Sequence, residues 1–184
     1  MATNSFYKKI VNVVVCAAMC FAGSGCDFIY HLLQKEGAEE KELLGEVNAL
    51  EKNENVALMQ KLLKLFGYKI GKIDGVLGVN TRNAIEAFQA DNDLKTTRFL
   101  DKATWEQLNI FESYGLVVKG EINAKTIQQA LKAAGYNPGP IDGKWGNKTQ
   151  TAIKNFQKAK RLKPDGRIGY KTLKELTKYL KAEE

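Results

Sequence analysis

Apolar and polar positions are distributed differently in three parts of the chain. Residues 10–22 (IVNVVVCAAMCFA) are nearly all apolar, whereas residues 35–55 are mostly charged or polar. From Val56 onward, apolar side chains recur every three or four residues, the spacing that places them on one face of an α-helix. This pattern predicts an α-helical folded region that begins at residue 56 and follows a polar segment.

The helical region contains an internal duplication. Residues 60–108 align with residues 128–176 at an offset of 68 residues and without a gap. The glycine-rich stretch GYKIGKIDGVLG (67–78) returns as GYNPGPIDGKWG (135–146). A fixed period of this kind identifies a repeated structural unit. Identical pairs outside the glycines include Gln60/Gln128, Asp74/Asp142, Thr81/Thr149, Phe88/Phe156 and Gln89/Gln157.

Each copy is predicted to form three short helices. In the first copy, Gly67 ends the first helix, Asn80 or Thr81 caps the second, and Asp101 caps the third. The predicted fold class is therefore all-α, with two tandem small three-helix bundles and glycine-rich loops. The predicted apolar faces consist of Leu58, Leu62 and Leu65, then Ala84, Ile85 and Phe88, then Trp105 and Leu108.

The N-terminus has the pattern of an export signal. Lys8 and Lys9 precede the apolar run, and small residues follow it, the order found in secretory signal peptides. The sequence Ala22-Gly23-Ser24-Gly25 before Cys26 resembles the lipobox of bacterial lipoproteins, although the usual leucine is replaced by Gly23. The resemblance implies cleavage after residue 25 and lipidation of Cys26. A plain secretory signal and an uncleaved anchor are the alternatives.

The remaining boundaries follow from composition and from the repeat. Residues 26–55 are predicted to be an acidic, partly helical and well solvated tether, in which Leu43, Leu44, Val47 and Leu50 have helical spacing. The two domains are predicted at residues 56–110 and 122–180, with a linker at 111–121. The export signal places both domains outside the cytoplasm.

The charge is uneven along the chain. Residues 35–55 contain seven Glu and three Lys, whereas residues 122–184 contain fourteen Lys or Arg and five acidic residues. A basic segment favours an anionic partner, and nucleic acid, anionic lipid and acidic cell-wall polymer all qualify. The export signal argues against nucleic acid.

The repeated residues resemble the three-helix peptidoglycan-binding domain found beside many bacterial wall hydrolases. The shared string is Gln, Leu, Gly-Tyr, Gly, Asp-Gly, Gly, Thr, Ala-Ile and Phe-Gln, and it occurs twice. The resemblance implies peptidoglycan as the partner and an accessory, non-catalytic role. In the second loop of copy one, Thr97-Arg98 replaces the Asp165-Gly166 of copy two. Copy one is therefore predicted to be eroded there, and copy two to be the better wall binder.

The candidate binding residues lie in the loops. Trp145, which replaces Leu77 of copy one, is interpreted as a sugar-stacking side chain or as an apolar plug. Gln89 and Gln157 either hold the loops in place or contact ligand, and the turn glycines Gly75, Gly78, Gly143, Gly146 and Gly166 are interpreted as structural. The full candidate set comprises Asp142, Lys144, Trp145, Thr149, Gln157, Asp165, Arg167, Asp74 and Gln89.

The sequence does not predict an enzyme, a cofactor or a metal site. The single histidine, His31, lies in the tether, and no cysteine follows Cys26, so His/Cys nucleophile or zinc constellations are not formed. The predicted function is a lipoprotein that connects a membrane, through Cys26, to peptidoglycan. Two alternatives stay open: a module that binds an envelope protein, and a wall hydrolase that uses carboxylates.

Overall fold

The structure, a computed structural model, describes residue 35 and residues 37–44 and 52–181 of the 184-residue chain. The predicted signal peptide at residues 1–25, Cys26, and the tether positions Val47 and Leu50 lie outside the described residues. Residues 37–44 are helical, which agrees with a partly helical tether. Within the described ranges, no helix is long and apolar enough to cross a membrane.

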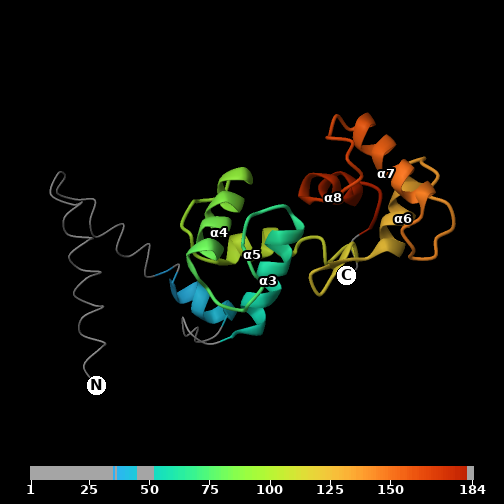
Figure 1. Ribbon diagram of the computed structural model, residues 1–184. Helices are drawn as coiled ribbons and strands as arrows, with labels where there is room; N and C mark the ends of the chain where they lie inside the picture. The colour runs from blue at the N-terminus through green and yellow to red at the C-terminus, as the bar shows by residue number, and fades with distance from the viewer. Residues whose placement is uncertain (1–34, 36, 45–51, 182–184) are drawn as a thin grey trace, which may run out of the picture.

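Repeat 1 (residues 52–109) is a three-helix bundle of α3 (Glu54–Leu65), α4 (Val79–Asp91) and α5 (Lys102–Asn109), in which α3 contacts both partners (Figure 1). Asp101 caps α5 as predicted, accepting the Thr104 N–H at 2.8 Å, and Gly67 with φ +99° follows the end of α3. The predicted cap of α4 is wrong, because Gly78 occupies that position. The buried apolar residues are Val56, Met59, Leu62, Leu63, Ile70, Ala84, Ile85, Phe88, Leu100 and Leu108.

Repeat 2 (residues 123–180) has the same plan. Helix α6 (Ala124–Ala133) contacts α7 (Asn147–Ala159) and α8 (Tyr170–Thr177). The predicted core pairs Ala84/Ala152, Ile85/Ile153 and Phe88/Phe156 are confirmed, because both members of each pair are buried. Buried Leu173, in contrast, corresponds to Trp105, which is only partly buried. The buried apolar residues of repeat 2 are Ala124, Ile127, Ala130, Leu131, Ala152, Ile153, Phe156, Tyr170, Leu173 and Leu176.

The predicted linker at 111–121 forms, together with Ile122, a short antiparallel hairpin of β1 (Val117–Val118) and β2 (Glu121–Ile122). Val117 pairs with Ile122, and Val118 with Glu121. Phe111 is 2% exposed and Leu116 is fully buried, so this segment adds apolar side chains to the core. The hairpin was not predicted, because two-residue strands are too short to show a period in the sequence.

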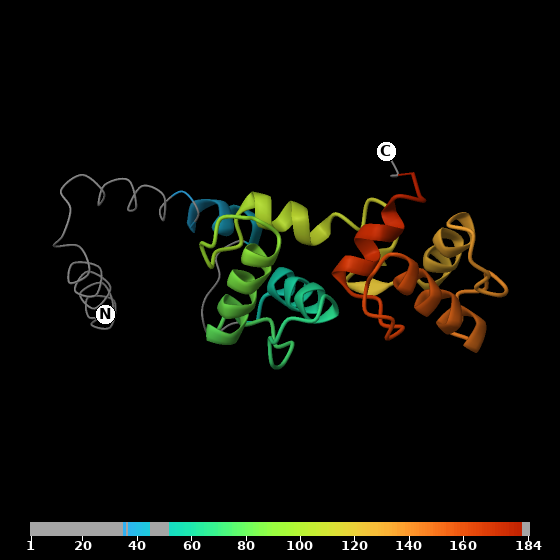
Figure 2. The same cartoon turned by 90° about the horizontal axis from the view of Figure 1, so that it is seen from above.

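The two repeats pack against each other through Tyr170, the first residue of α8. Its ring lies 5.3 Å from the ring of Phe66, 5.7 Å from Phe88 and 5.2 Å from Phe111, centroid to centroid and edge to face. Its hydroxyl pairs with the side-chain amide of Gln107 on α5. Edge-to-face ring pairs add specific packing energy to apolar burial. The two repeats are therefore in direct contact and are not connected by the linker alone (Figure 2).

Residues 37–44 pack on repeat 1 in both views, whereas a well solvated tether was predicted (Figures 1 and 2). Leu44 is 3% exposed and Glu40 is 7% exposed. The side-chain amide of Asn53, the cap of α3, donates to the Leu44 carbonyl at 2.7 Å. Because this segment buries both an apolar and a charged side chain, it is part of the folded domain.

The turn glycines serve two different roles. Gly75, Gly143 and Gly166 have φ of +74°, +76° and +76°, the left-handed region in which a side chain is strained. At Gly75 a Cβ atom would also come within 2.9 Å of the Asn53 carbonyl oxygen. Gly78 and Gly146 have φ of −84° and −91° and cap α4 and α7. Positive φ is therefore not the reason for glycine at these two positions.

Candidate functional site

The first glycine-rich loop of each repeat (residues 67–78 and 135–146) is held by one buried glutamine. In repeat 2 the Gln128 Oε1 accepts the Gly143 N–H at 2.8 Å, and Nε2 donates to the Lys144 carbonyl at 3.0 Å. Gln60 makes the equivalent bonds to Gly75, at 2.9 Å, and Val76, at 3.0 Å. These glutamines were not among the predicted site residues. A polar residue repeated on an otherwise apolar helix face was the signal for this role.

The second loop of each repeat (residues 92–101 and 160–169) is also held by the side-chain amide of one buried glutamine. The Gln157 Oε1 accepts the Gly166 N–H at 2.9 Å, and its Nε2 donates to the Arg167 carbonyl at 2.8 Å. The Gln89 Oε1 accepts the N–H groups of Thr97 and Arg98 at 2.9 and 3.0 Å. Both glutamines are at most 1% exposed. Of the two predicted roles, the geometry favours holding the loop.

The second loop of repeat 1 differs in sequence but keeps its backbone conformation. Arg98 has φ +67°, close to the +76° of Gly166. The Thr97 hydroxyl accepts the Phe99 N–H at 3.2 Å, where the Asp165 carboxylate accepts the Arg167 N–H at 2.9 Å. The erosion predicted for copy one therefore concerns side chains and not the course of the chain.

Three candidate aspartates are engaged by their own turns. The Gln60 amide and then the Val76 N–H lower the pKa of the Asp74 carboxyl. Hydrogen bonds from the Lys144 N–H and the Gln128 amide lower the pKa of Asp142 in the same way. The Arg167 N–H is the main cause of the lowered pKa of Asp165. A lowered pKa keeps these carboxyls ionised, whereas a general acid needs a raised one. This favours structural roles in the turns.

The predicted site residues of repeat 2 lie in two separate places, whereas Asp74 and Gln89 belong to repeat 1. Asp142, Lys144, Trp145 and Thr149 belong to the first loop of repeat 2 and the start of α7. Thr149 is 1% exposed and donates to the Pro138 carbonyl at 2.8 Å. Trp145 is 44% exposed, so the plug interpretation is wrong and its ring is open for stacking. A cavity of about 360 Å³ lies beside this loop and is lined by Tyr136, Asn137, Asn147, Lys148, Thr151, Ala152 and Asn155.

Gln157, Asp165 and Arg167 lie elsewhere, at a cavity of about 810 Å³ between the repeats. Repeat 1 contributes the end of α3, the turn after it and one face of α4. Repeat 2 contributes its second loop and the start of α8. The lining from repeat 1 includes Phe66, Tyr68, Lys69, Asn83, Asp91 and Asn92, and that from repeat 2 includes Lys163, Asp165, Arg167, Ile168, Lys171 and Lys174.

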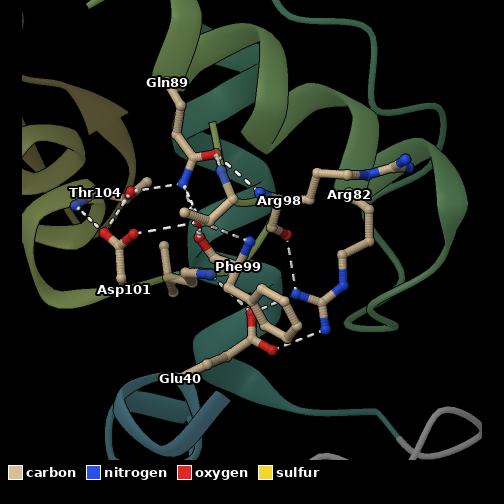
Figure 3. A network of polar contacts seen from close by, with 9 residues as sticks. Glu40, Arg82, Gln89, Arg98, Phe99, Asp101 and Thr104 are labelled. Carbon is tan, nitrogen blue, oxygen red and sulfur yellow. Dashed lines mark hydrogen bonds and ion pairs between the residues drawn. The ribbon is translucent and has the colours of Figure 1, made fainter. Parts of the chain in front are cut away.

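A polar network covers the second loop of repeat 1 (Figure 3). The Glu40 carboxylate accepts from Arg82 at 2.5 and 2.7 Å and from the Leu100 N–H at 2.8 Å. The Arg82 guanidinium lies 4.9 Å from the centre of the Phe99 ring and donates to the Arg98 carbonyl at 3.0 Å. A two-bonded Arg–carboxylate pair is among the stronger polar contacts in proteins. No signal in the sequence predicted this pair.

Comparison with known families identifies the repeated unit. The model of the family described as "Putative peptidoglycan binding domain" matches residues 52–108 and 114–176. The chain belongs to this family. Membership confirms the tandem peptidoglycan-binding domains and their all-α fold, and it supports binding to the cell wall.

One similar protein is the N-acetylmuramoyl-L-alanine amidase CwlL of Bacillus licheniformis. It is 28% identical over 186 aligned positions, which cover 98% of this chain and 45% of the amidase. The chain therefore spans about half the length of this curated relative. No solved structure matches the chain. Among the described residues, no group of three or more His, Cys, Asp or Glu side chains is arranged to hold a metal ion.

Proposed function

We propose that the protein is a non-catalytic, lipid-anchored tether that binds peptidoglycan through its tandem domains. The observation that carries this proposal is the double match to a binding-domain family, which accounts for nearly all of residues 52–181. The exposed Trp145 and the neighbouring Lys144 offer an aromatic face and a cation to a polymer of sugars and acidic peptides. Confinement near a membrane would strengthen weak wall sites by raising their effective concentration.

Wall binding is tested by co-sedimentation with purified sacculi. A chain that starts at residue 27 keeps every described residue, and we expect it to pellet with the sacculi. Trp145→Ala should weaken binding about threefold to tenfold, since aromatic contacts contribute about 0.5–1.5 kcal/mol. The control is Ile110→Ala, because Ile110 is apolar and 40% exposed, close to the exposure of Trp145. Equal effects of the two substitutions would count against a role for Trp145, and a failure to pellet would count against wall binding.

The lipid anchor is tested separately in cells. Cys26→Ser should abolish incorporation of a labelled fatty acid and release the protein from membranes, because two acyl chains hold a protein firmly at about 0.8 kcal/mol per buried methylene. Cys20→Ser is the matched control, since it removes a thiol six positions earlier. Continued labelling and membrane retention of the Cys26→Ser protein would reject the anchor.

The similarity to an amidase supports a second candidate, a role in peptidoglycan hydrolysis. Release of soluble fragments from dye-labelled sacculi distinguishes the two candidates. A pure binding protein pellets with sacculi and releases no dye, whereas a hydrolase releases dye at a rate that rises with protein concentration. An envelope-protein partner, the remaining alternative, would instead appear as stoichiometric capture without sacculus binding.

A further inference from the structure

On repeat 1, a surface at the second loop holds carboxylates that the chain itself supplies. Glu40 accepts the Leu100 N–H at 2.8 Å and pairs with Arg82, and Glu39 accepts the Lys102 N–H at 3.2 Å. Backbone N–H groups before and at the start of a helix are suited to anions, because they are unpaired and carry partial positive charge. The segment 37–44 thus shows which chemistry this surface of the fold accepts.

On repeat 2, no carboxylate of the described residues accepts the N–H groups at the corresponding two positions. At the offset of 68 residues, Leu100 corresponds to Ile168 and Lys102 to Tyr170. Asp101 caps α5 with its side chain, but Gly169 stands at that position in repeat 2 and gives α8 no side-chain cap. Ile168 and Tyr170 both line the cavity of about 810 Å³ between the repeats. The second loop of repeat 2 therefore faces a space instead of a bound glutamate.

The charge of that cavity favours an anion. Its lining carries five cationic side chains and two carboxylates. Both carboxylates are engaged, since Asp91 accepts the Tyr68 hydroxyl at 3.0 Å and Asp165 accepts the Arg167 N–H at 2.9 Å. Lys163 also lies 3.8 Å from the Asp165 carboxylate, so the other cations carry the excess of positive charge that is left for a ligand. The five cations are Lys69, Lys163, Arg167, Lys171 and Lys174, and all five side chains are exposed.

We propose that the cavity between the repeats binds a carboxylate of a short peptide, and that Glu40 closes the corresponding surface on repeat 1. This inference rests on the proposed function in one respect, namely that the peptide stems of the wall supply the carboxylate. Arg167 is suited to grip a carboxylate through two parallel hydrogen bonds, and Lys171 on α8 adds a second charge. The cavity has walls from both repeats, so each chain holds one such site and not two.

The test is a calorimetric titration with a soluble muropeptide that carries free stem carboxylates. We expect one carboxylate-dependent site per chain, and a loss of about tenfold or more in its affinity when the stem carboxylates are amidated. The double variant Arg167→Ala/Lys171→Ala should lose a similar factor. The control Lys125→Ala/Lys132→Ala removes the same charge from exposed positions on α6 outside the cavity and should change affinity less than about twofold.

Three outcomes would overturn the proposal: equal losses of affinity in the two double variants, unchanged affinity for the amidated muropeptide, or two carboxylate-dependent sites per chain. Binding of a poly(glycerol phosphate) in place of the muropeptide would also overturn it, because phosphate would then be the ligand chemistry. Sacculus binding keeps the two hypotheses apart. If the wild type pellets with sacculi and the Arg167→Ala/Lys171→Ala chain pellets equally well, the cavity is excluded while wall binding stands. If the wild type does not pellet but binds the soluble muropeptide through Arg167, only the proposed function fails.

Discussion

Glu40→Ala is expected to lower the free energy of unfolding by about 3 kcal/mol, one of the two largest losses predicted for this chain. Removing one partner of a buried ion pair costs about 3–5 kcal/mol, because the other charge stays desolvated. The lower end applies, since the Glu40 side chain is 9% exposed and that of Arg82 is 25% exposed. The substitution would also remove the carboxylate to which the Leu100 N–H donates a hydrogen bond. Denaturant unfolding of the chain from residue 27 onward measures the change.

The neighbouring glutamate provides the control for this substitution. Glu39 is 30% exposed at its side chain and makes longer contacts, to Lys102 N–H at 3.2 Å and to Lys35 at 3.8 Å. Exposed pairs contribute less than about 1 kcal/mol, so Glu39→Ala should have a small effect. Acetate, compared with chloride at equal ionic strength, should raise the unfolding midpoint of Glu40→Ala more than that of the wild type. If both substitutions lowered the free energy of unfolding by the same small amount, residues 37–44 would not belong to the folded domain.

The duplication made most of the fold predictable from the sequence. Two aligned copies separate positions that the fold requires from positions that vary, and this identified the helices, the turn glycines and the core pairs such as Phe88 and Phe156. The residue type alone was enough to predict that Asp101 caps its helix. Where local rules compete, prediction was less accurate. Asn80 and Thr81 are good caps by type, but Thr81 is used inside the domain as a partner of Gln60.

The features that the sequence did not reveal are contacts between distant segments. Tyr170 and Phe66 come from different repeats and differ from their counterparts Lys102 and Ala134, so comparing the copies could not mark them as paired. Glu40 lies 42 residues from Arg82, in a segment whose charge suggested solvent exposure. Charge alone does not reveal burial, because a paired and hydrogen-bonded carboxylate can be buried. The cavity between the repeats follows from such contacts and was equally hidden.

Gln128→Ala is the second large effect, again with an expected loss of about 3 kcal/mol. The substitution leaves the Gly143 N–H and the Lys144 carbonyl without their partner at 2.8 and 3.0 Å, and each unsatisfied group costs about 1–3 kcal/mol. Gln129→Ala is the matched control, because Gln129 is the next residue on the same helix and is exposed. Alanine is the better helix former, so this control should be neutral or slightly stabilising.

Gln128→Glu separates the hydrogen bond that the side-chain amide accepts from the one that it donates. The introduced carboxylate keeps an acceptor for the Gly143 N–H but loses the donor, and it faces Asp142 at the 3.2 Å contact. Repulsion raises the folded-state pKa of the introduced carboxyl above its unfolded value, so the deficit in stability should be largest at neutral pH. As the pH falls through that raised pKa, protonation restores a donor and the deficit should shrink. If the loss of stability did not change with pH, the hydrogen bond that the Gln128 amide donates would be dispensable. The bond from the Gly143 N–H to the side-chain oxygen would then be enough to fix the loop that carries Trp145.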